Sequence, residues 1–329
     1  MADIGSRFRR AISDRTNPLI LDGGLATQME SYGADLSGHL WSARLLRDDP
    51  ALIKRTHAAF YMAGSDLATS ASYQATVAGF VRAGNSAEEG ERLLRSSIRL
   101  LKEARDEAWR KIQAEGGEGG RMKPFAAASV GCYGASLADG SEYTGIYDIG
   151  KEEVKAFHLE RLKLLVKEEP DVLAFETIPN LMEVEAILDV LNHQDVSSSE
   201  IPAWISVCCR SDECLSSGEP VDDFVRLVAA RSPATRQLVA VGVNCLHPRY
   251  VEKILERMKV GSKLALVVYA NKGEEWDAEE KRWMPGTATE DDEYCRMAEM
   301  WRSMGANMIG GCCRTSVDTI RMLRQKLVR

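Results

Sequence analysis

The segment VLAFETIPNLMEVEAILDVL, residues 172–191, contains one strand–helix unit of the kind that decides the fold of this chain. Residues 172–175 are apolar without polar alternation, which is typical of a strand covered on both faces. Residues 181–191 have the length and composition of a helix. The polar pair Glu176-Thr177 stands where the strand ends.

The same alternation recurs along the whole chain. Strands are predicted at 19–22, 66–70, 125–130, 172–175, 203–207, 238–243, 264–269 and 308–310. Helices are predicted at 50–63, 87–112, 151–167, 181–191, 221–230, 250–258, 291–304 and 317–327. Eight such units predict a single-domain α/β (β/α)8 TIM barrel over residues 1–329, with 1–17 as an N-terminal helix or extension. A doubly wound open sheet is the alternative.

Composition narrows the functional class. The 329 residues are 45% apolar and carry a net charge of −7, which argues against a nucleic-acid partner. The N-terminus has no apolar signal region, and runs such as 264–270 are too short to span a membrane. We expect a cytoplasmic protein with no membrane partner. The eight cysteines of such a chain are expected to be thiols or metal ligands rather than disulfides.

The catalytic groups of a barrel lie at the C-terminal ends of its strands. Reading those ends gives a short list of polar candidates: Asp22-Gly23-Gly24, Ser72-Tyr73-Gln74, Glu176-Thr177, Asn244-Cys245 and Gly310-Gly311-Cys312-Cys313. The carboxylates of Asp22 and Glu176 share this end, so they could anchor an amino group. They could equally be a turn residue and a solvated charge.

Three cysteines in this list can converge although they are far apart in sequence. Cys245 follows the sixth strand and Cys312-Cys313 follow the eighth, and alternate strands contribute side chains to the same layer. Both members of the pair can face one ion only if the backbone leaves the strand, a freedom that we expect Gly310-Gly311 to provide. Three thiolates with one open position are typical of catalytic zinc. The alternative is that each cysteine is a small buried hydrophobic residue.

A rival cluster follows the fifth strand. Cys208, Cys209 and Cys214 could form a three-thiol site, but no glycines precede them and no partner cysteine except the offset Cys132 supports them. Two other residues complete the survey of possible ligands. Cys295 is expected to pack inside a helix, and His247 to lie at the surface or to support a ligand.

These residues resemble a known family, the homocysteine S-methyltransferases, over nearly the whole chain. The matching motifs are LDGGLATQ (21–28), LWSARLL (40–46), TSASYQAT (69–76), FETIPN (175–180), VGVNC (241–245) and GGCCRT (310–315). The segment YGASLADGSEYTG (133–145) further resembles the branch that uses S-methylmethionine or S-adenosylmethionine rather than betaine.

The resemblance implies one zinc ion per chain bound by Cys245, Cys312 and Cys313, with the homocysteine sulfur as fourth ligand. It also implies methyl transfer from a sulfonium donor to homocysteine, giving methionine. The substrate-binding residues it implies are Asp22, Gly23, Trp41, Tyr73, Glu176 and Asn244. Trp41 and Tyr73 could also be ordinary packing aromatics.

Several alternatives stay open at this point. Selenocysteine could be the acceptor, or the cysteines could serve a non-enzymatic zinc or redox protein. Another barrel chemistry would need a phosphate site or a nucleophilic lysine, and neither is evident. Cys132 and Ala270 replace prolines that are usual in relatives, which bears on the choice of donor. Carboxylates in 271–284 could attract its cation or be simply solvated, and we expect a monomer.

Overall fold

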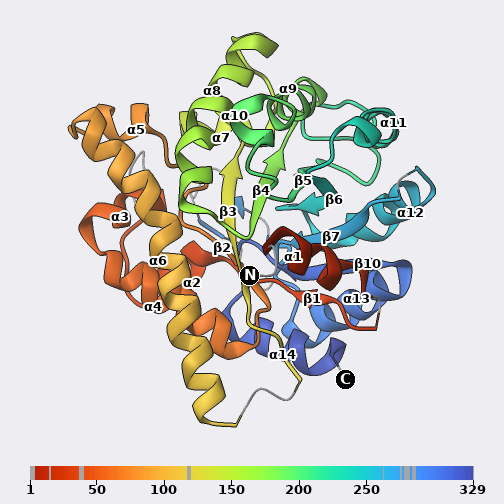
Figure 1. Ribbon diagram of the computed structural model, residues 1–329. Coiled ribbons are helices and arrows are strands. Elements are labelled where there is room, and N and C mark those ends of the chain that lie inside the picture. The colour runs from red at the N-terminus through yellow and green to blue at the C-terminus, as the bar shows by residue number, and fades with distance from the viewer. Residues whose placement is uncertain are drawn as a thin grey trace.

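The computed structural model describes residues 4–14, 16–36, 41–116, 120–261, 263–274, 276–277, 282–283 and 287–328. Within them, eight parallel strands lie side by side in the order β1-β10-β7-β6-β5-β4-β3-β2. Figure 1 shows them around a central axis with the helices outside. The strands are β1 (Leu19–Ile20), β2 (Leu67–Thr69), β3 (Phe125–Gly131), β4 (Val172–Ile178), β5 (Ala203–Val207), β6 (Leu238–Asn244), β7 (Ala265–Ala270) and β10 (Ala306–Gly311). A separate antiparallel pair contains β8 (Trp276–Asp277) and β9 (Arg282–Trp283).

Asp66, just before β2, joins the two end strands of this sheet. Its backbone N–H donates to the carbonyl of Ile20 at 2.6 Å, and the N–H of Ile20 donates to its Oδ2 at 3.0 Å. Arg324 pairs with the same carboxylate at 2.6 Å. Because β1 and β2 are joined in this way, the strands form a nearly closed ring. The (β/α)8 TIM barrel is therefore confirmed, and the doubly wound open sheet is excluded.

The helices form the outer ring and begin and end at recognisable signals. The Asp49 side chain accepts a hydrogen bond from the N–H of Leu52 at the start of α4, and Gly64 ends that helix with a φ of 120°. The helices after α1 are α2 (Leu25–Ser31), α3 (Leu45–Asp48), α4 (Pro50–Ala63), α5 (Val77–Arg82), α6 (Ala87–Ala114), α7 (Tyr133–Leu137), α8 (Lys151–Leu165), α9 (Leu181–Leu191), α10 (Gln194–Ser197), α11 (Val221–Arg231), α12 (Val251–Gly261), α13 (Asp291–Met304) and α14 (Val317–Leu327). Short 3-10 turns are η1 (Trp41–Arg44), η2 (Ser141–Tyr143), η3 (Val166–Glu168), η4 (Ser232–Ala234) and η5 (Pro248–Tyr250).

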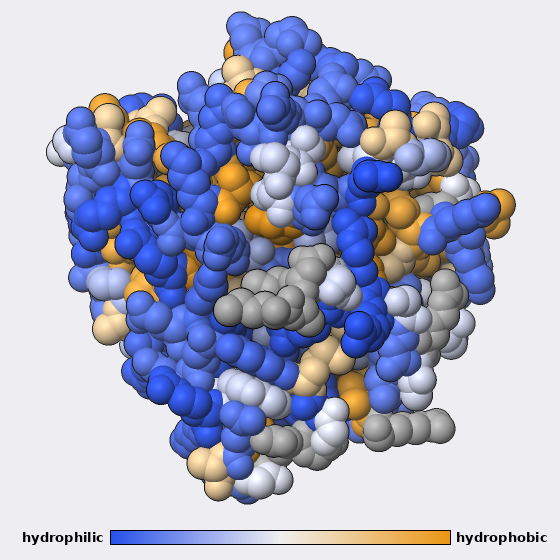
Figure 2. All heavy atoms as spheres, in the orientation of Figure 1, coloured by the Kyte–Doolittle hydropathy of each residue, from blue (hydrophilic) through white to orange (hydrophobic). Residues whose placement is uncertain are grey.

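Helix α1 (Ile4–Ser13) closes the N-terminal end of the barrel. Its Phe8 is fully buried and meets the ring of Phe125, the first residue of β3, at 5.2 Å in an edge-on contact. Burying an apolar side chain of this size stabilises the fold by roughly 1.5–3 kcal/mol. Figure 1 shows α1 across the middle of this face, and Figure 2 shows the same face to be mainly hydrophilic. The opposite end, where the strands finish, is the end that can form a site.

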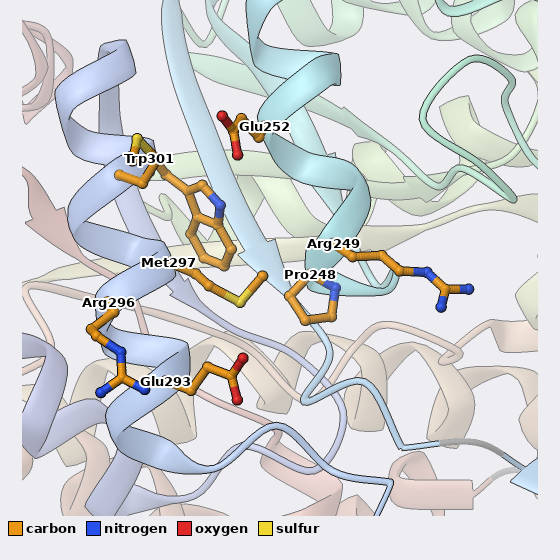
Figure 3. A pocket seen from close by; sticks show the side chains of 8 residues that line it. Pro248, Arg249, Glu252, Glu293, Arg296, Met297 and Trp301 are labelled. Carbon is orange, nitrogen blue, oxygen red and sulfur yellow. The ribbon is translucent and has the colours of Figure 1, made fainter.

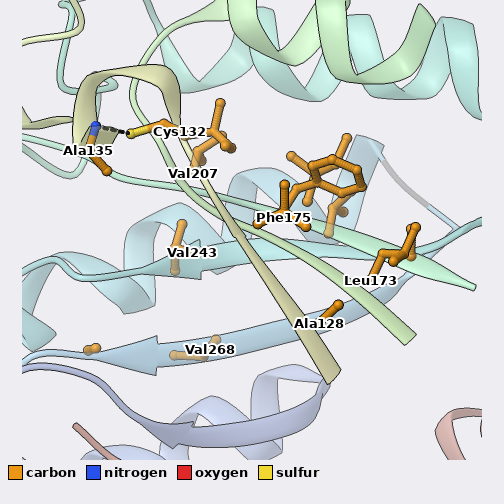
Figure 4. Close-up of a cluster of buried hydrophobic side chains, with 14 of the residues drawn as sticks. Ala128, Cys132, Ala135, Leu173, Phe175, Val207, Val243 and Val268 are labelled. Atoms are coloured by element: carbon orange, nitrogen blue, oxygen red, sulfur yellow. Dashed lines mark hydrogen bonds between the residues drawn. The ribbon is translucent and has the colours of Figure 1, made fainter. Parts of the chain in front are cut away.

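A second apolar layer fills the space between the strands and the outer helices. Leu173, Phe175, Val207, Val243 and Val268 belong to one continuous buried cluster, part of which Figure 4 shows. The strands are therefore covered on both faces, as their continuous apolar sequences predict.

The observed elements differ from the predicted ones mainly at the C-terminal ends of strands. β1 stops at Ile20 rather than at Asp22, because residues 21–24 turn into α2, a helix that the sequence analysis did not predict. The short helix α7 was also not predicted. The predicted N-terminal helix is present as α1. No helix in the described part of the chain is both long and apolar enough to cross a membrane.

Candidate active site

Three thiols meet at the C-terminal end of the barrel. Cys245 directly follows β6, and Cys312 and Cys313 directly follow β10. Their three sulfur atoms all lie within 4.8 Å of one another, and Cys245 Sγ is 3.8 Å from Cys313 Sγ. Among the described residues, this is the one set of three potential ligands from His, Cys, Asp and Glu that comes so close together. The predicted convergence of these cysteines is therefore present in the structure.

Backbone contacts hold the three cysteines in place. Cys245 adopts a left-handed conformation with a φ of 54°, which turns its side chain away from the course of β6. Its N–H donates to the Tyr269 carbonyl at 3.2 Å, and its own carbonyl accepts from the thiol of Cys208 at 3.1 Å. The N–H of Cys313 donates to Asn271 Oδ1 at 3.1 Å. A site built on such contacts is organised before any ligand arrives.

Gly310 and Gly311 serve a different purpose from the one predicted. Both lie within β10, and neither has a positive φ, so they do not provide an unusual backbone angle. A Cβ at Gly310 would lie 2.5 Å from the Cβ of Leu21, and one at Gly311 would lie 2.3 Å from Thr315 Oγ1. The glycines are needed because other chain segments approach β10 closely. The backbone leaves the strand only after them, at Cys312.

The cysteine cluster fits a tetrahedral metal ion. Two thiolates bound to zinc at about 2.3 Å and at the tetrahedral angle lie about 3.8 Å apart. The observed distance between Cys245 Sγ and Cys313 Sγ is also 3.8 Å. Hydrogen bonds from the thiols of Cys312 and Cys313 and from the Tyr143 hydroxyl lower the pKa of Cys245 well below its usual value. Their hydrogen bonds to Cys245 in turn raise the pKa of Cys312 and Cys313, so the cluster favours one thiolate, on Cys245, which is the form in which cysteine binds metal.

Two buried carboxylates, Asp22 and Glu176, lie at the same end of the barrel. Asp22 Oδ2 accepts from the backbone N–H of Thr69 at 2.9 Å, and Glu176 accepts from the hydroxyl of Ser129. Burial, together with the charge of Cys245 nearby, raises the pKa of Glu176 to about 7, although hydrogen bonds from Ser129 and Tyr269 act in the opposite direction. Burial also raises the pKa of Asp22, and the charge of Glu176 adds to that effect.

Neither carboxylate has a cationic partner among the residues that the structure describes. The ion pairs formed by the described residues include neither Asp22 nor Glu176, although both side chains are more than nine-tenths buried. A buried negative charge without a counterion is costly. This arrangement can bind an ammonium group that a ligand supplies.

The other predicted site residues have different surroundings. The amide of Asn244 accepts from the Thr177 N–H at 2.7 Å and donates to its hydroxyl at 2.8 Å, so it holds the end of β4, where Thr177 has a φ of 59°. Gly23 is packed so closely that a Cβ there would lie 2.9 Å from Thr315 Oγ1. Tyr73 lies near the thiols, since Cys245 affects its pKa. The side chain of Trp41 lies outside the described residues.

The rival cysteines do not form a second cluster of this kind. Cys209 and Cys214 face Leu215 and Pro220 in isolated antiparallel bridges after β5. Burial raises the pKa of both Cys208 and Cys209, which disfavours the thiolate. Cys295 is fully buried in α13, as predicted.

Three further residues near the predicted site have surroundings that were not foreseen. His247 Nδ1 accepts from the N–H of Arg249 at 3.2 Å and so caps η5. Cys132 caps α7 through a hydrogen bond from the N–H of Ala135, drawn in Figure 4. Among the carboxylates in 271–284, which were predicted either to attract the donor's cation or to be solvated, the structure describes the side chain of Glu274, and it pairs with Arg314.

Two residues that were not predicted from the sequence, Tyr143 and Glu142, touch this site or lie beside it. The Tyr143 hydroxyl lies 3.4 Å from Cys245 Sγ, and Glu142 is close enough to Cys245 for the thiolate to raise its pKa. Both belong to the 133–145 segment, which was assigned to the donor as a whole without naming residues. One sequence feature could have identified them: this Glu-Tyr pair stands between Gly140-Ser141 and Thr144-Gly145, which are residues typical of turns.

A hollow of about 300 Å³ lies elsewhere, between η5, α12 and α13. Figure 3 shows its lining, which includes Arg249, Glu252, Glu293 and Arg296. It contains none of the predicted site residues. Because both acidic and basic side chains line this hollow, they indicate no single class of ligand. The thiol cluster therefore remains the candidate active site.

Comparison with known proteins agrees with this geometry. Residues 19–327 match the family model described as homocysteine S-methyltransferase. The chain is 42% identical over 312 residues to homocysteine S-methyltransferase 1 of Arabidopsis thaliana, covering 94% of this chain and 93% of that one. It is 41% identical over 314 residues to a selenocysteine Se-methyltransferase of Brassica oleracea var. italica, covering 94% and 88%.

A solved structure is also similar along nearly its whole length. This is the metallated form of the homocysteine methyltransferase MmuM from Escherichia coli, with a TM-score of 0.81 and 35% identity, covering 96% of this chain and 98% of that one. The family model, the relatives and the solved structure all indicate the same class of protein. The chain therefore belongs to the homocysteine S-methyltransferase family and is an enzyme of that class.

Proposed function

We propose that this enzyme transfers a methyl group from a sulfonium donor to the thiol of homocysteine, with one zinc ion held by Cys245, Cys312 and Cys313. One observation carries the proposal: three converging thiols lie at the same end of the barrel as two buried carboxylates that form no ion pair within the described part of the chain. A thiol-binding centre and an ammonium-binding centre together match the two ends of homocysteine. A purely metal-storing protein would have no need of the second.

Zinc is the ion that three thiolates with one open position suit best. When bound, it would keep the substrate thiol in its nucleophilic thiolate form. The solved structure of MmuM is a metallated form, which supports a metal in this fold. The assignment of zinc in this chain rests on the donor set and its spacing.

The chain's own residues orient the acceptor. Asp22 and Glu176 bind its ammonium group, while Thr69 and Ser129 hold the two carboxylates through hydrogen bonds. Asn244 acts through Thr177 on the end of β4, which carries Glu176. We therefore assign Asn244 a positioning role rather than direct contact with substrate. Because Gly23 has no side chain, the segment that follows β1 can pack closely against Thr315.

The reaction removes charge, which suits a site with little water. A thiolate and a sulfonium become two neutral thioethers, so a water-excluding environment favours the product side and the transition state. The step needs no general acid or base.

S-methylmethionine is the donor that we favour over S-adenosylmethionine. The sequence has no Gly-rich nucleotide fingerprint after a strand, so nothing in it requires a nucleoside site. Selenocysteine is a second candidate acceptor, because one similar protein is named a selenocysteine Se-methyltransferase. A selenolate and a thiolate make nearly the same demands on zinc.

Two measurements test the proposal. In a zinc titration monitored by X-ray absorption, homocysteine should add a fourth sulfur to a three-sulfur metal shell. In a rate assay, both sulfonium donors should be compared against both acceptors, with betaine as the control donor. A preference for S-adenosylmethionine above about tenfold, equal to roughly 1.4 kcal/mol, would reverse the donor assignment alone. Turnover with betaine only, or an unchanged metal shell, would contradict the proposal itself.

A further inference from the structure

The 133–147 segment brings two side chains to the thiol cluster from outside the barrel. It contains α7 and η2, and it follows β3 directly. The hydroxyl of Tyr143 reaches Cys245 Sγ at 3.4 Å, while 49% of the residue remains exposed. Tyr143 thus forms part of the wall between the thiols and the solvent.

Glu142, its neighbour in the chain, is a buried carboxyl group with a hydrogen bond to its own backbone N–H. It is 9% exposed, and its Oε2 has no hydrogen-bond partner among the described residues. Burial raises its pKa, and the negative charges of Cys245 and Asp139 raise it further. No ion pair of the described residues includes Glu142. Glu142 is therefore a third uncompensated acid at this end of the barrel, and homocysteine provides only one cation.

Aromatic rings accompany this carboxylate. The ring of Tyr73 packs against the end of β3, where a Cβ at Gly131 would lie 2.6 Å from its Cδ2 atom. Burial raises the pKa of Tyr73, and the charges of Cys132, Tyr143, Cys245 and Glu142 add to this effect. The faces of aromatic rings attract onium cations, and a nearby carboxylate strengthens the attraction. The two tyrosines and Glu142 make a cation-binding surface next to the sulfur of Cys245.

Buried contacts on the outer side hold the segment rigidly. Glu183 is fully buried, and it accepts from the N–H of Tyr133 at 2.7 Å and from the hydroxyl of Tyr147 at 2.6 Å. Asn180 Nδ2 donates to the carbonyl of Gly145 at 2.8 Å. These contacts lie on both sides of Glu142 in the sequence. The carboxylate is therefore placed by the fold rather than free to turn outward.

We propose that Glu142 is the counterion of the donor's sulfonium, with Tyr143 and Tyr73 packing against that cation. This inference rests on the proposed function and specifies how the donor is recognised. In the transfer, the bond from the methyl carbon to the donor sulfur breaks, and its electron pair stays on that sulfur. The acceptor thiolate supplies the pair for the new bond. The donor becomes a neutral thioether, so Glu142 binds the substrate more strongly than the spent product.

The test compares two ligands that differ in the sulfonium charge. Calorimetry on the zinc-loaded enzyme would measure the affinities for S-methylmethionine and for methionine, which has the same amino acid head. In wild type, the sulfonium should bind more tightly. In Glu142→Gln, that preference should fall by roughly tenfold to one hundredfold, because the sulfonium loses its ion pair with a buried carboxylate. Zinc content and homocysteine affinity should not change.

Companion variants separate this role from a general disturbance. Glu152→Gln removes a carboxylate from the exposed surface of α8, where its side chain is 79% exposed, and should leave the preference intact. Glu142→Asp keeps the charge and should keep part of the preference, which covers the case in which the glutamine variant fails to fold.

Tyr143→Leu should weaken sulfonium binding by about threefold to fivefold through loss of the cation–π contact. In Glu142→Gln, KM for the donor should rise more than kcat falls. The reason is that the donor sulfur has its full positive charge when it binds and loses that charge during the transfer.

Three outcomes would overturn the inference. An unchanged preference in a folded Glu142→Gln protein would remove the sulfonium role. Equal losses for S-methylmethionine and methionine would assign Glu142 to the amino acid head instead. A matching loss of homocysteine affinity would assign it to the acceptor. Failure of the proposed function would be visible in wild type itself, as absence of transfer from any sulfonium donor.

Discussion

The chain contains two cysteine triplets near the ends of barrel strands, and only one of them converges. Cys245, Cys312 and Cys313 come from two strands and place their sulfurs within 4.8 Å of one another. Cys208, Cys209 and Cys214 come from one strand end and the loop that follows it, and among the described residues they form no such cluster. The triplet that is compact in sequence is thus the dispersed one in space.

The difference shows what a metal site requires of a barrel. Neighbouring strand residues point to opposite faces, so cysteines adjacent in one strand diverge. Convergence needs separate strands whose ends meet, together with a backbone turn at each ligand. Cys245 makes this turn with its φ of 54°. Cys208 has a supporting position instead, since its thiol donates to the carbonyl of Cys245.

Replacing a member of the converging triplet should have the largest effect. Cys245→Ser, Cys312→Ser and Cys313→Ser should each lose bound zinc and nearly all activity, because serine is a far poorer zinc ligand. The loss of zinc affinity should exceed the roughly 10–100-fold cost of removing a residue that only supports a ligand. Metal analysis of the purified proteins checks this. Full zinc content in all three variants would refute the site.

The carboxylates beside that triplet should produce the next largest effect. Glu176→Gln and Asp22→Asn should weaken homocysteine binding by roughly tenfold to one hundredfold and leave zinc in place, because each loses a charge-assisted hydrogen bond to an ammonium. Calorimetry on zinc-loaded proteins measures both quantities. The exposed carboxylate of Glu152 provides a matched control in Glu152→Gln. Unchanged homocysteine affinity in both variants would show that neither acid binds the amino group.

Homocysteine binding should depend on pH through Glu176. Burial raises the pKa of this carboxyl to about 7, so it takes up a proton as pH falls through 7 and then no longer attracts an ammonium. Affinity should fall by up to about tenfold per pH unit below this value. In Glu176→Gln this component should be absent, which leaves the dependence due to the substrate thiol and to Asp22, whose pKa burial also raises. Identical pH profiles for the two proteins would contradict the assignment.

The rival triplet should give the smallest effects. Cys209→Ser and Cys214→Ser should retain about one zinc per chain, since neither thiol lies in the converging cluster. Cys208→Ala removes the hydrogen bond to the Cys245 carbonyl and should cost about 1 kcal/mol of stability, measurable by denaturant unfolding. Loss of zinc from Cys209→Ser or Cys214→Ser would move the metal site to the rival triplet.

Much of this architecture could be predicted from local patterns. The strand cores at 172–175, 203–207 and 238–243 lie within β4, β5 and β6, because continuous apolar runs need burial on both faces. The errors fall where the chain leaves the strands. There, hydrogen bonds to distant segments decide the path, as Asp66 does for β1 and Asn271 does for Cys313. Neither partner can be inferred from neighbouring residues.

The sequence alone determined the alternation of strands and helices, the ends of strands as the catalytic face, and the candidate ligands Cys245, Cys312 and Cys313. These follow from periodicity and residue chemistry, which act over a few neighbouring positions. Only the tertiary structure decided that Gly310 and Gly311 provide space rather than backbone freedom, that Asn244 holds Thr177, and that Glu142 and Tyr143 lie beside the thiols. Each of these depends on contacts between segments far apart in the chain, and such contacts exist only once the barrel has closed.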